Sequence, residues 1–301
     1  APCGVSTRTC GNVALRAATL ARMEASLTWL QAVVLGIVQG LTEFLPISST
    51  AHLRVVPAFA GWQDPGAAVS AIIQLGTMAA VVLFFWRDLV RILSAWLSTV
   101  VLRRRTEATK ADALMGWFII AGTIPISVFG LAFKDHIETS ARDLRLIGTT
   151  LIVLGALMWV CDKVFAQTKA VTDLNLRSAM VFGLAQALAL IPGVSRSGAT
   201  ITAGRAMGFS REAAARYSFL LSIPAVVLSG GLEAVSAGGS GNVPWGATII
   251  ATIIAFIVGY ASIAWLLKWL VTHSTAVFAG YRILLGALVL LLVAKGAIAP
   301  K

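Results

Sequence analysis

Long apolar stretches separated by short polar ones make up most of the chain. Six of these stretches carry few charges, and each is close to the roughly 20 residues that a helix needs to cross a bilayer. They are 65–86, 113–133, 144–165, 216–236, 245–267 and 276–294. The pattern therefore predicts six transmembrane helices.

Two further apolar segments are interrupted by proline. Segment 27–45 ends at Pro46 and segment 178–191 ends at Pro192, and in each case a polar cluster precedes a second short apolar stretch. A helix that stops at membrane depth and then restarts is typical of a re-entrant hairpin, whose backbone must be buried in protein or line a cavity. An ordinary kinked span is the alternative, but the polar clusters favour two re-entrant hairpins.

The two interrupted segments also resemble each other. Each runs from Gly-x-x-Gln, beginning at Gly36 and at Gly183, through a Leu-rich stretch to proline and then to hydroxyl residues. Interrupted apolar segments in both halves of a chain indicate an inverted repeat with a binding site near the bilayer midplane. Because the similarity is short, chance is the alternative. The predicted fold is an all-α polytopic membrane protein with six transmembrane helices and two re-entrant helical hairpins, in repeat halves of about 27–165 and 175–298.

Composition agrees with a membrane protein and excludes other classes. Of the 301 residues 58% are apolar and 12% are charged, about half the charged fraction of soluble domains. This excludes a soluble enzyme, a disordered chain and a fibrous protein. The net charge of +11 is not accompanied by a basic domain or by zinc-ligand spacing, so we expect no nucleic-acid partner. Three cysteines form neither a disulfide framework nor a metal-ligand pattern.

The distribution of Lys and Arg predicts the orientation. If each hairpin enters and leaves on one face, three spans separate the hairpins, which then open to opposite sides. Most Lys and Arg then fall on one side, including the loop Arg103–Arg105, and the positive-inside rule makes that side cytoplasmic. Residues 1–26 carry arginines but no long apolar core, so we expect a dispensable extension before a single membrane domain, 27–301.

Three ionisable side chains within the apolar zone are candidates for function, because charges there are costly. They are Glu43, His52 and Arg196. Gln39 lies one helical turn before Glu43, so both point to the same helix face. A structural acid and a structural histidine are the alternatives for the first two.

The segment 192–200 is the most specific signal in the chain. Pro-Gly ends one half-helix, and Ser195 or Ser197 can cap the next. The N–H groups at a half-helix N-terminus form an anion site, and the Arg196 guanidinium matches phosphate oxygens. The first hairpin repeats this plan with three hydroxyl residues, Ser48, Ser49 and Thr50. The alternative is a structural cap in which Arg196 pairs with the acid of the first hairpin.

The motifs QGLTEFLPISSTAH at 39–52 and PGVSRSGAT at 192–200 resemble the two signatures of the undecaprenyl-diphosphate phosphatase family, the bacitracin-resistance type. Segments 73–77 and 85–87 resemble the third helix of that family. The resemblance covers nearly all of 27–298. It implies hydrolysis of undecaprenyl diphosphate to the monophosphate and inorganic phosphate in the bacterial inner membrane, which recycles the lipid carrier of peptidoglycan synthesis and gives bacitracin resistance. It also implies six spans with two re-entrant helix pairs, and a homodimer.

Roles follow from the chemistry of a diphosphate. The catalytic candidates are Glu43, Ser49, His52 and Arg196; the substrate-binding candidates are Gln39, Ser48, Thr50, Ser195, Ser197, Gly198 and Thr200. Ser49 or His52 attacks, or His52 is the base for Ser49 or for water; we favour Ser49 with His52 beside it. Glu43 orients His52 or holds Mg²⁺ or Ca²⁺ together with substrate oxygens. The family motif accepts Glu or Gln at the first acidic position, which here is Gln39, so Glu43 is the single carboxylate of that pair.

A transporter or flippase for a lipid phosphate is the strongest alternative function, because opposed hairpins are transporter architecture and the same anion site could serve transport. The base and the hydroxyl residues favour chemistry, since transport does not require them. A channel or a structural membrane protein would not explain an arginine within the Ser-Arg-Ser-Gly turn.

Overall fold

The computed structural model describes residues 27–101, 106–133, 143–238 and 243–300. The expected extension 1–26 and the loop Arg103–Arg105 lie outside these residues. The elements are α2 (Trp29–Phe44), α3 (Ser49–Ala60), α4 (Gly66–Phe84), α5 (Trp86–Val100), α6 (Glu107–Ala132), α8 (Leu144–Val164), η1 (Val171–Asp173), α9 (Leu176–Ala187), η2 (Leu188–Leu190), α10 (Arg196–Ala206), α11 (Arg211–Gly238), α12 (Trp245–Thr272) and α13 (Ala276–Ala294). Over the described residues the fold is helical, as the sequence predicts.

Four helical segments in the described part of the chain are long and apolar enough to span a membrane: Thr109–Ala132 in α6, α8, α12 and α13. A fifth span results if α4 and α5 are counted together, although they are bent by 71° at Phe85. The predicted stretch 65–86 corresponds to α4 and this bend, and 216–236 lies within α11. The protein is thus a multi-pass membrane protein with four or five candidate spans.

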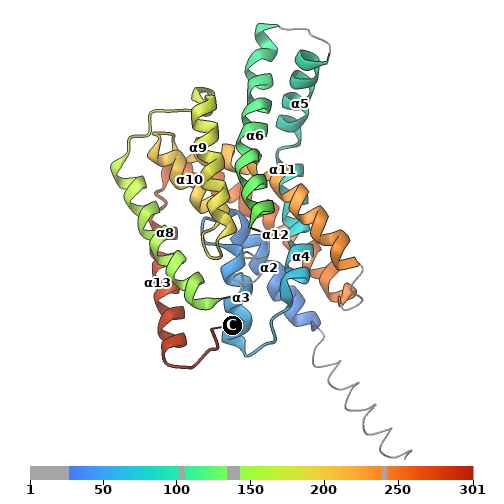
Figure 1. The fold of residues 1–301 in the computed structure, drawn as a ribbon, viewed down its shortest axis with the longest axis vertical. Coiled ribbons are helices and arrows are strands. Elements are labelled where there is room, and N and C mark those ends of the chain that lie inside the picture. The colour runs from blue at the N-terminus through green and yellow to red at the C-terminus, as the bar shows by residue number, and fades with distance from the viewer. Residues whose placement is uncertain (1–26, 102–105, 134–142, 239–242, 301) are drawn as a thin grey trace, which may run out of the picture.

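The two interrupted segments fold as helical hairpins, α2–α3 and α9–α10. A capping box between Thr28 and Gln31 begins α2, and Leu45 is extended because the following Pro46 disfavours helical geometry at that residue. At 16 residues, α2 is too short to cross a bilayer alone. The hairpins enter the molecule from opposite ends, so that their turns come together in its interior (Figure 1).

Helices from the first half of the chain pack on helices from the second half. Helix α2 lies along α12, α9 lies along α6, α8 packs on α13 and α4 packs on α11. The first two pairs approach closely at matching glycines. A Cβ on Gly36 would lie 2.6 Å from the Ala251 carbonyl oxygen, and a Cβ on Gly183 would lie 2.4 Å from that of Gly122.

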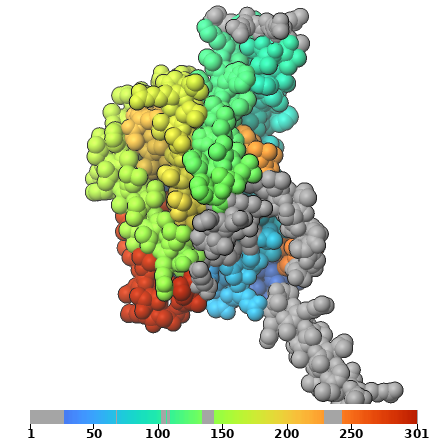
Figure 2. Space-filling model, in the orientation of Figure 1, coloured from blue at the N-terminus to red at the C-terminus, as the bar shows by residue number. Residues whose placement is uncertain are grey.

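Helices α5 and α6 project as a pair beyond the other helices (Figure 2). The main buried apolar cluster lies around α11, where Phe219 contacts Phe44 and Phe85 and Tyr217 contacts Phe182. This core lies against the hairpin turns and supports the polar residues there.

Candidate active site

The two hairpin turns have the same backbone geometry. Ser48 and Ser195 cap α3 and α10, with φ of 77° and 68°, and they are the non-glycine residues with positive φ in the described chain. Each serine Oγ accepts a hydrogen bond from the third residue of its helix, at Ala51 N and Gly198 N. Such backbone costs about 1–3 kcal/mol per residue and is typical of functional sites. The turns therefore present two helix N-termini to each other.

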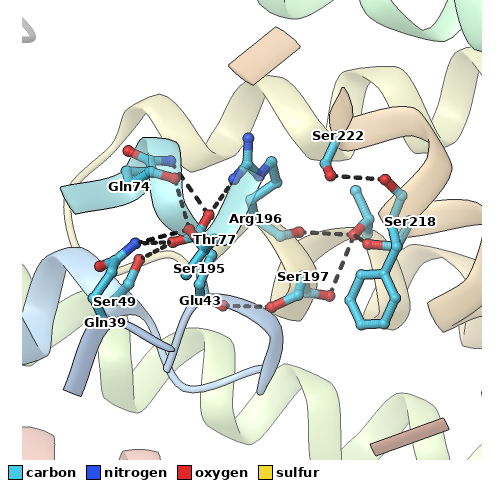
Figure 3. Close-up of polar contacts among 12 residues, drawn as sticks. Gln39, Glu43, Ser49, Gln74, Thr77, Ser195, Arg196, Ser197, Ser218 and Ser222 are labelled. Carbon is cyan, nitrogen blue, oxygen red and sulfur yellow. Dashed lines mark hydrogen bonds and ion pairs between the residues drawn. The ribbon is translucent and has the colours of Figure 1, made fainter. Parts of the chain in front are cut away.

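The Glu43 carboxylate is the centre of the polar cluster between the turns (Figure 3). Oε2 accepts hydrogen bonds from Ser49 Oγ at 2.6 Å and from Gln39 Nε2 at 3.0 Å. Oε1 forms an ion pair with Arg196 and accepts from Gln74 Nε2 at 3.3 Å. The Glu43 side chain is only 6% exposed, so this acid is stabilised by the donors around it.

Gln39 extends the cluster toward α4. Its Nε2 also lies 3.4 Å from Thr77 Oγ1, while its buried Oε1 has no hydrogen-bond partner. A buried polar atom without a partner is costly. Gln39 Oε1 is therefore available to a ligand with positive charge or with a donor group.

The second turn contacts the first through Ser197. Its Oγ donates to the Leu45 carbonyl at 3.2 Å and lies 3.2 Å from Ser195 Oγ. The glycine at 198 allows a further contact, because a Cβ there would lie 2.4 Å from Arg282 Nη1.

Arg282, from the middle of α13, holds both turns. Its Nη1 donates to the Pro46 carbonyl at 3.1 Å, and its Nη2 donates to the Gly193 and Val194 carbonyls at 3.0 and 2.8 Å. The side chain is fully buried. Its charge therefore faces the dipoles of backbone carbonyls that have left the helical hydrogen-bond pattern.

His52 contacts Ser48 and Tyr281, and its catalytic role stays a prediction. Its Nδ1 lies 2.7 Å from the Ser48 carbonyl and its Nε2 lies 2.7 Å from the Tyr281 hydroxyl. Because a carbonyl only accepts, Nδ1 carries the proton and Nε2 accepts from tyrosine. The imidazole thus contacts Ser48 and Tyr281, and the expected pairing with Ser49 or Glu43 is not among its contacts.

The structure brings some of the predicted site residues together and places others elsewhere. It brings Gln39, Glu43, Ser49 and Arg196 into direct contact, and Ser48, Ser195, Ser197 and Gly198 form the turns beside them. Thr200 is fully buried, donates to the Arg196 carbonyl and lies 2.5 Å from Ser218 Oγ, so it packs against α11. Thr50 is exposed. The Arg196–Glu43 pair of the alternative interpretation is present.

Four residues of the site were missed by the sequence interpretation: Gln74, Thr77, Tyr281 and Arg282. A signal existed for Arg282, because it is an ionisable residue within the apolar stretch 276–294 and so meets the criterion applied to Glu43. Gln74 and Thr77 lie in segment 73–77, and its resemblance to the third helix of the family was the signal that could have found them. The tyrosine in α13 gave no comparable signal.

The oxygen atoms of the cluster suit a hard divalent cation. The Glu43 carboxylate and the Ser49 hydroxyl are adjacent, and Mg²⁺ and Ca²⁺ take oxygen ligands. No group of three or more His, Cys, Asp or Glu that could hold a metal occurs among the described residues. One carboxylate with substrate phosphate oxygens matches the usual mode of Mg²⁺ binding.

The family model for "Bacitracin resistance protein BacA" matches residues 32–288. The chain belongs to the BacA family. It is 55% identical over 272 residues to "Undecaprenyl-diphosphatase" of Nocardioides sp., covering 90% of this chain and 98% of the relative. It is 51% identical over 286 residues to "Undecaprenyl-diphosphatase 2" of Streptomyces avermitilis, covering 91% and 98%. It is 50% identical over 277 residues to "Undecaprenyl-diphosphatase" of Micrococcus luteus, covering 90% and 99%.

The region that matches the BacA model contains the whole site, from Gln39 on α2 to Arg282 on α13. The residues that the turns bring together therefore lie within the part of the chain that defines the family.

Proposed function

We propose that this BacA-family protein hydrolyses undecaprenyl diphosphate to undecaprenyl phosphate and inorganic phosphate, which recycles the lipid carrier of cell-wall synthesis. The observation that carries the proposal is the contact of Ser49, Glu43 and Arg196 between two half-helix N-termini. The names of the relatives support the substrate.

Arg196 and the helix N-termini would bind the diphosphate. The first amides of α3 and α10 have no partner within their own helices, and the dipoles of both helices favour an anion there. Arg196 is 19% exposed whereas Glu43 is 6% exposed. Arg196 can thus exchange one contact with the carboxylate for phosphate oxygens without leaving the site.

Ser49 is the proposed nucleophile and Glu43 its base, because Ser49 Oγ already donates to Glu43 Oε2. Ser49 Oγ forms a bond to the terminal phosphorus as its proton passes to Glu43. The bond from that phosphorus to the bridging oxygen breaks, Glu43 passes the proton to that oxygen, and undecaprenyl phosphate leaves. Water then attacks the phosphorus of the serine phosphate as Glu43 accepts its proton. The bond from phosphorus to Ser49 Oγ breaks, Glu43 returns the proton to Oγ, and phosphate leaves. Arg196 stabilises the charge on the phosphoryl oxygens in both steps.

A Mg²⁺ or Ca²⁺ ion would be held by Glu43 together with substrate phosphate oxygens. When bound, such an ion neutralises charge on the phosphate oxygens. His52 holds the Ser48 carbonyl in this scheme, and through it the turn that presents Ser49.

The finer membrane arrangement is part of the proposal: six transmembrane helices, two re-entrant hairpins in an inverted repeat, and the Arg103–Arg105 loop on the cytoplasmic side of the bacterial inner membrane. The matching caps at Ser48 and Ser195 and the matching helix pairs support the repeat. The homodimer stays a prediction from the family resemblance.

Phosphate release by the purified protein from undecaprenyl diphosphate tests the function, with Mg²⁺, with Ca²⁺ and with neither. We expect Arg196→Ala and Glu43→Gln each to lose about 10²-fold or more of the rate, the size expected for loss of a base or of transition-state charge stabilisation. Arg145→Ala, which removes an exposed charge at the start of α8, is the matched control.

Folded parent protein that binds the lipid but releases no phosphate would contradict hydrolysis and favour transport of the lipid phosphate. Normal turnover by Arg196→Ala would contradict its role at the phosphate.

A further inference from the structure

A second polar site lies at the end of the molecule where α8 and α12 end and where α11 and α13 begin. A cavity of about 450 Å³ there is lined by Asp162, Lys163, Phe165, Ala166, Gln167, Arg211 and Ser274. None of these residues belongs to the cluster around Glu43.

The cavity carries excess positive charge. Asp162 Oδ1 accepts from Arg205 Nε at 3.0 Å and from Arg211 Nε at 2.7 Å, while Oδ2 accepts from Ser274 Oγ and from Thr275 N. Two arginines thus pair with the single Asp162 carboxylate, which leaves one positive charge in excess. Lys163 adds a further positive charge to the lining.

The donors differ in whether they are free to bind a ligand. Arg205 is buried, and its guanidinium also donates to the carbonyls of residues 165, 166 and 209. The terminal nitrogens of Arg211, in contrast, lie 3.1 and 3.2 Å from the side-chain oxygen of Gln167 when the amide is oriented to accept from them. This partner carries no charge. Lys163 is exposed and lies over the Trp159 ring at 5.4 Å. Arg211 and Lys163 are therefore the groups that can turn to an anion.

The surroundings are those of a lipid headgroup. Trp159 and Trp265 are 45% and 46% exposed on α8 and α12, just before those helices end, and tryptophan is enriched at the membrane–water boundary. Val164 and Val277, beside the cavity in sequence, are 70% and 64% exposed. A basic pocket between helices at this depth, with apolar surface beside it, fits an amphiphile with an anionic head.

We propose that this cavity binds the phosphate of an anionic phospholipid through Lys163 and Arg211, with the acyl chains on the apolar surface of α8 and α13. The site is separate from the diphosphate site and does not depend on the hydrolysis proposed above.

Native mass spectrometry of the full chain in detergent tests the site, by titration with phosphatidylglycerol and with phosphatidylcholine of the same acyl chains. We expect tighter binding of phosphatidylglycerol. Lys163→Gln should weaken it about fivefold, the effect of one cation near an anionic headgroup, and Arg211→Gln should weaken it by at least as much. Lys268→Gln removes an exposed charge from α12 outside the cavity and is the matched control.

Equal binding of the two lipids, or equal weakening by the control, would overturn the proposal. Displacement of phosphatidylglycerol by millimolar inorganic phosphate would also overturn it, because the site would then recognise a free anion. Lys163 makes no hydrogen bond that the fold needs, so loss of binding in Lys163→Gln cannot be attributed to unfolding of the Asp162 cluster.

Discussion

At the scale of residues, Glu43 and His52 have separate sets of contacts. Glu43 accepts from Ser49 Oγ and pairs with Arg196, so one carboxylate contacts both the proposed nucleophile and the proposed phosphate-binding cation. His52 instead joins Ser48 to Tyr281. A residue that braces a turn and a residue that takes a proton respond differently to substitution.

We expect His52→Gln and Tyr281→Phe to lower the rate while leaving the shape of the pH–rate profile that of the parent. The reason is that both act through the Ser48 carbonyl and not through proton transfer to substrate. The measurement is phosphate release across pH 5 to 9. If His52→Gln lost one limb of the pH–rate profile, His52 would be the base. A decrease in rate of 10²- to 10⁴-fold on that limb alone, the range of general-base catalysis, would support the same conclusion.

At the scale of elements, the hairpins depend on close contact with long helices. Gly183 lets α9 approach the Gly122 carbonyl on α6, and Gly36 does the same for α2 on α12. Neither partner atom can move without shifting a helix backbone, so these positions tolerate no side chain.

Gly183→Ala should therefore destabilise the protein by about 1–3 kcal/mol, the usual cost of overpacking. Thermal unfolding in detergent measures the effect. Gly280→Ala on α13 is the control, because a Cβ there meets nothing within 4 Å and alanine favours the helix. Equal stability of the two variants would contradict the close approach of α9 and α6.

Arg282 links three elements, because α13 supplies the donors for carbonyls of both turns. We expect Arg282→Met to lose both stability and phosphate release, since three buried carbonyls lose their donor at a cost of about 1–3 kcal/mol each. Lys295→Met, an exposed change at the end of the same helix, should retain both. Full activity of Arg282→Met would show that the turns hold their geometry without it.

At the scale of the whole molecule, the proposed inverted repeat predicts which ends of the protein face which side of the membrane. Gln63 follows α3 and Thr168 precedes α9, and both are exposed. The loop after α3 and the loop before α9 lie at opposite ends of the molecule (Figure 1). In an inverted repeat, these ends face opposite sides of the membrane.

Single cysteines at these positions, in a chain whose Cys3, Cys10 and Cys161 are replaced, should react from opposite sides of intact cells. A membrane-impermeant thiol reagent should label Gln63→Cys and leave Thr168→Cys unlabelled until the membrane is opened. The same labelling of both positions would contradict re-entrant hairpins, and reversed labelling would contradict the positive-inside assignment.

The sequence by itself determined the class of the protein, the two interrupted segments and most of the chemical groups. The length of an apolar stretch, a proline at its break and a charge within it can each be read from a short segment of sequence. They are informative because placing free backbone groups or charges in lipid is costly. Glu43, Arg196 and the capping serines could be found in this way. The family motifs then indicated the substrate.

Only the tertiary structure decided which of these groups meet. Ser49 and His52 are three residues apart in the chain, yet one turns to Glu43 and the other to Tyr281 on α13. Thr200 lies in a signature motif but faces α11, and Arg282 lies far from both motifs but holds both turns. Such contacts depend on how helices distant in sequence pack, and local pattern carries no information on that.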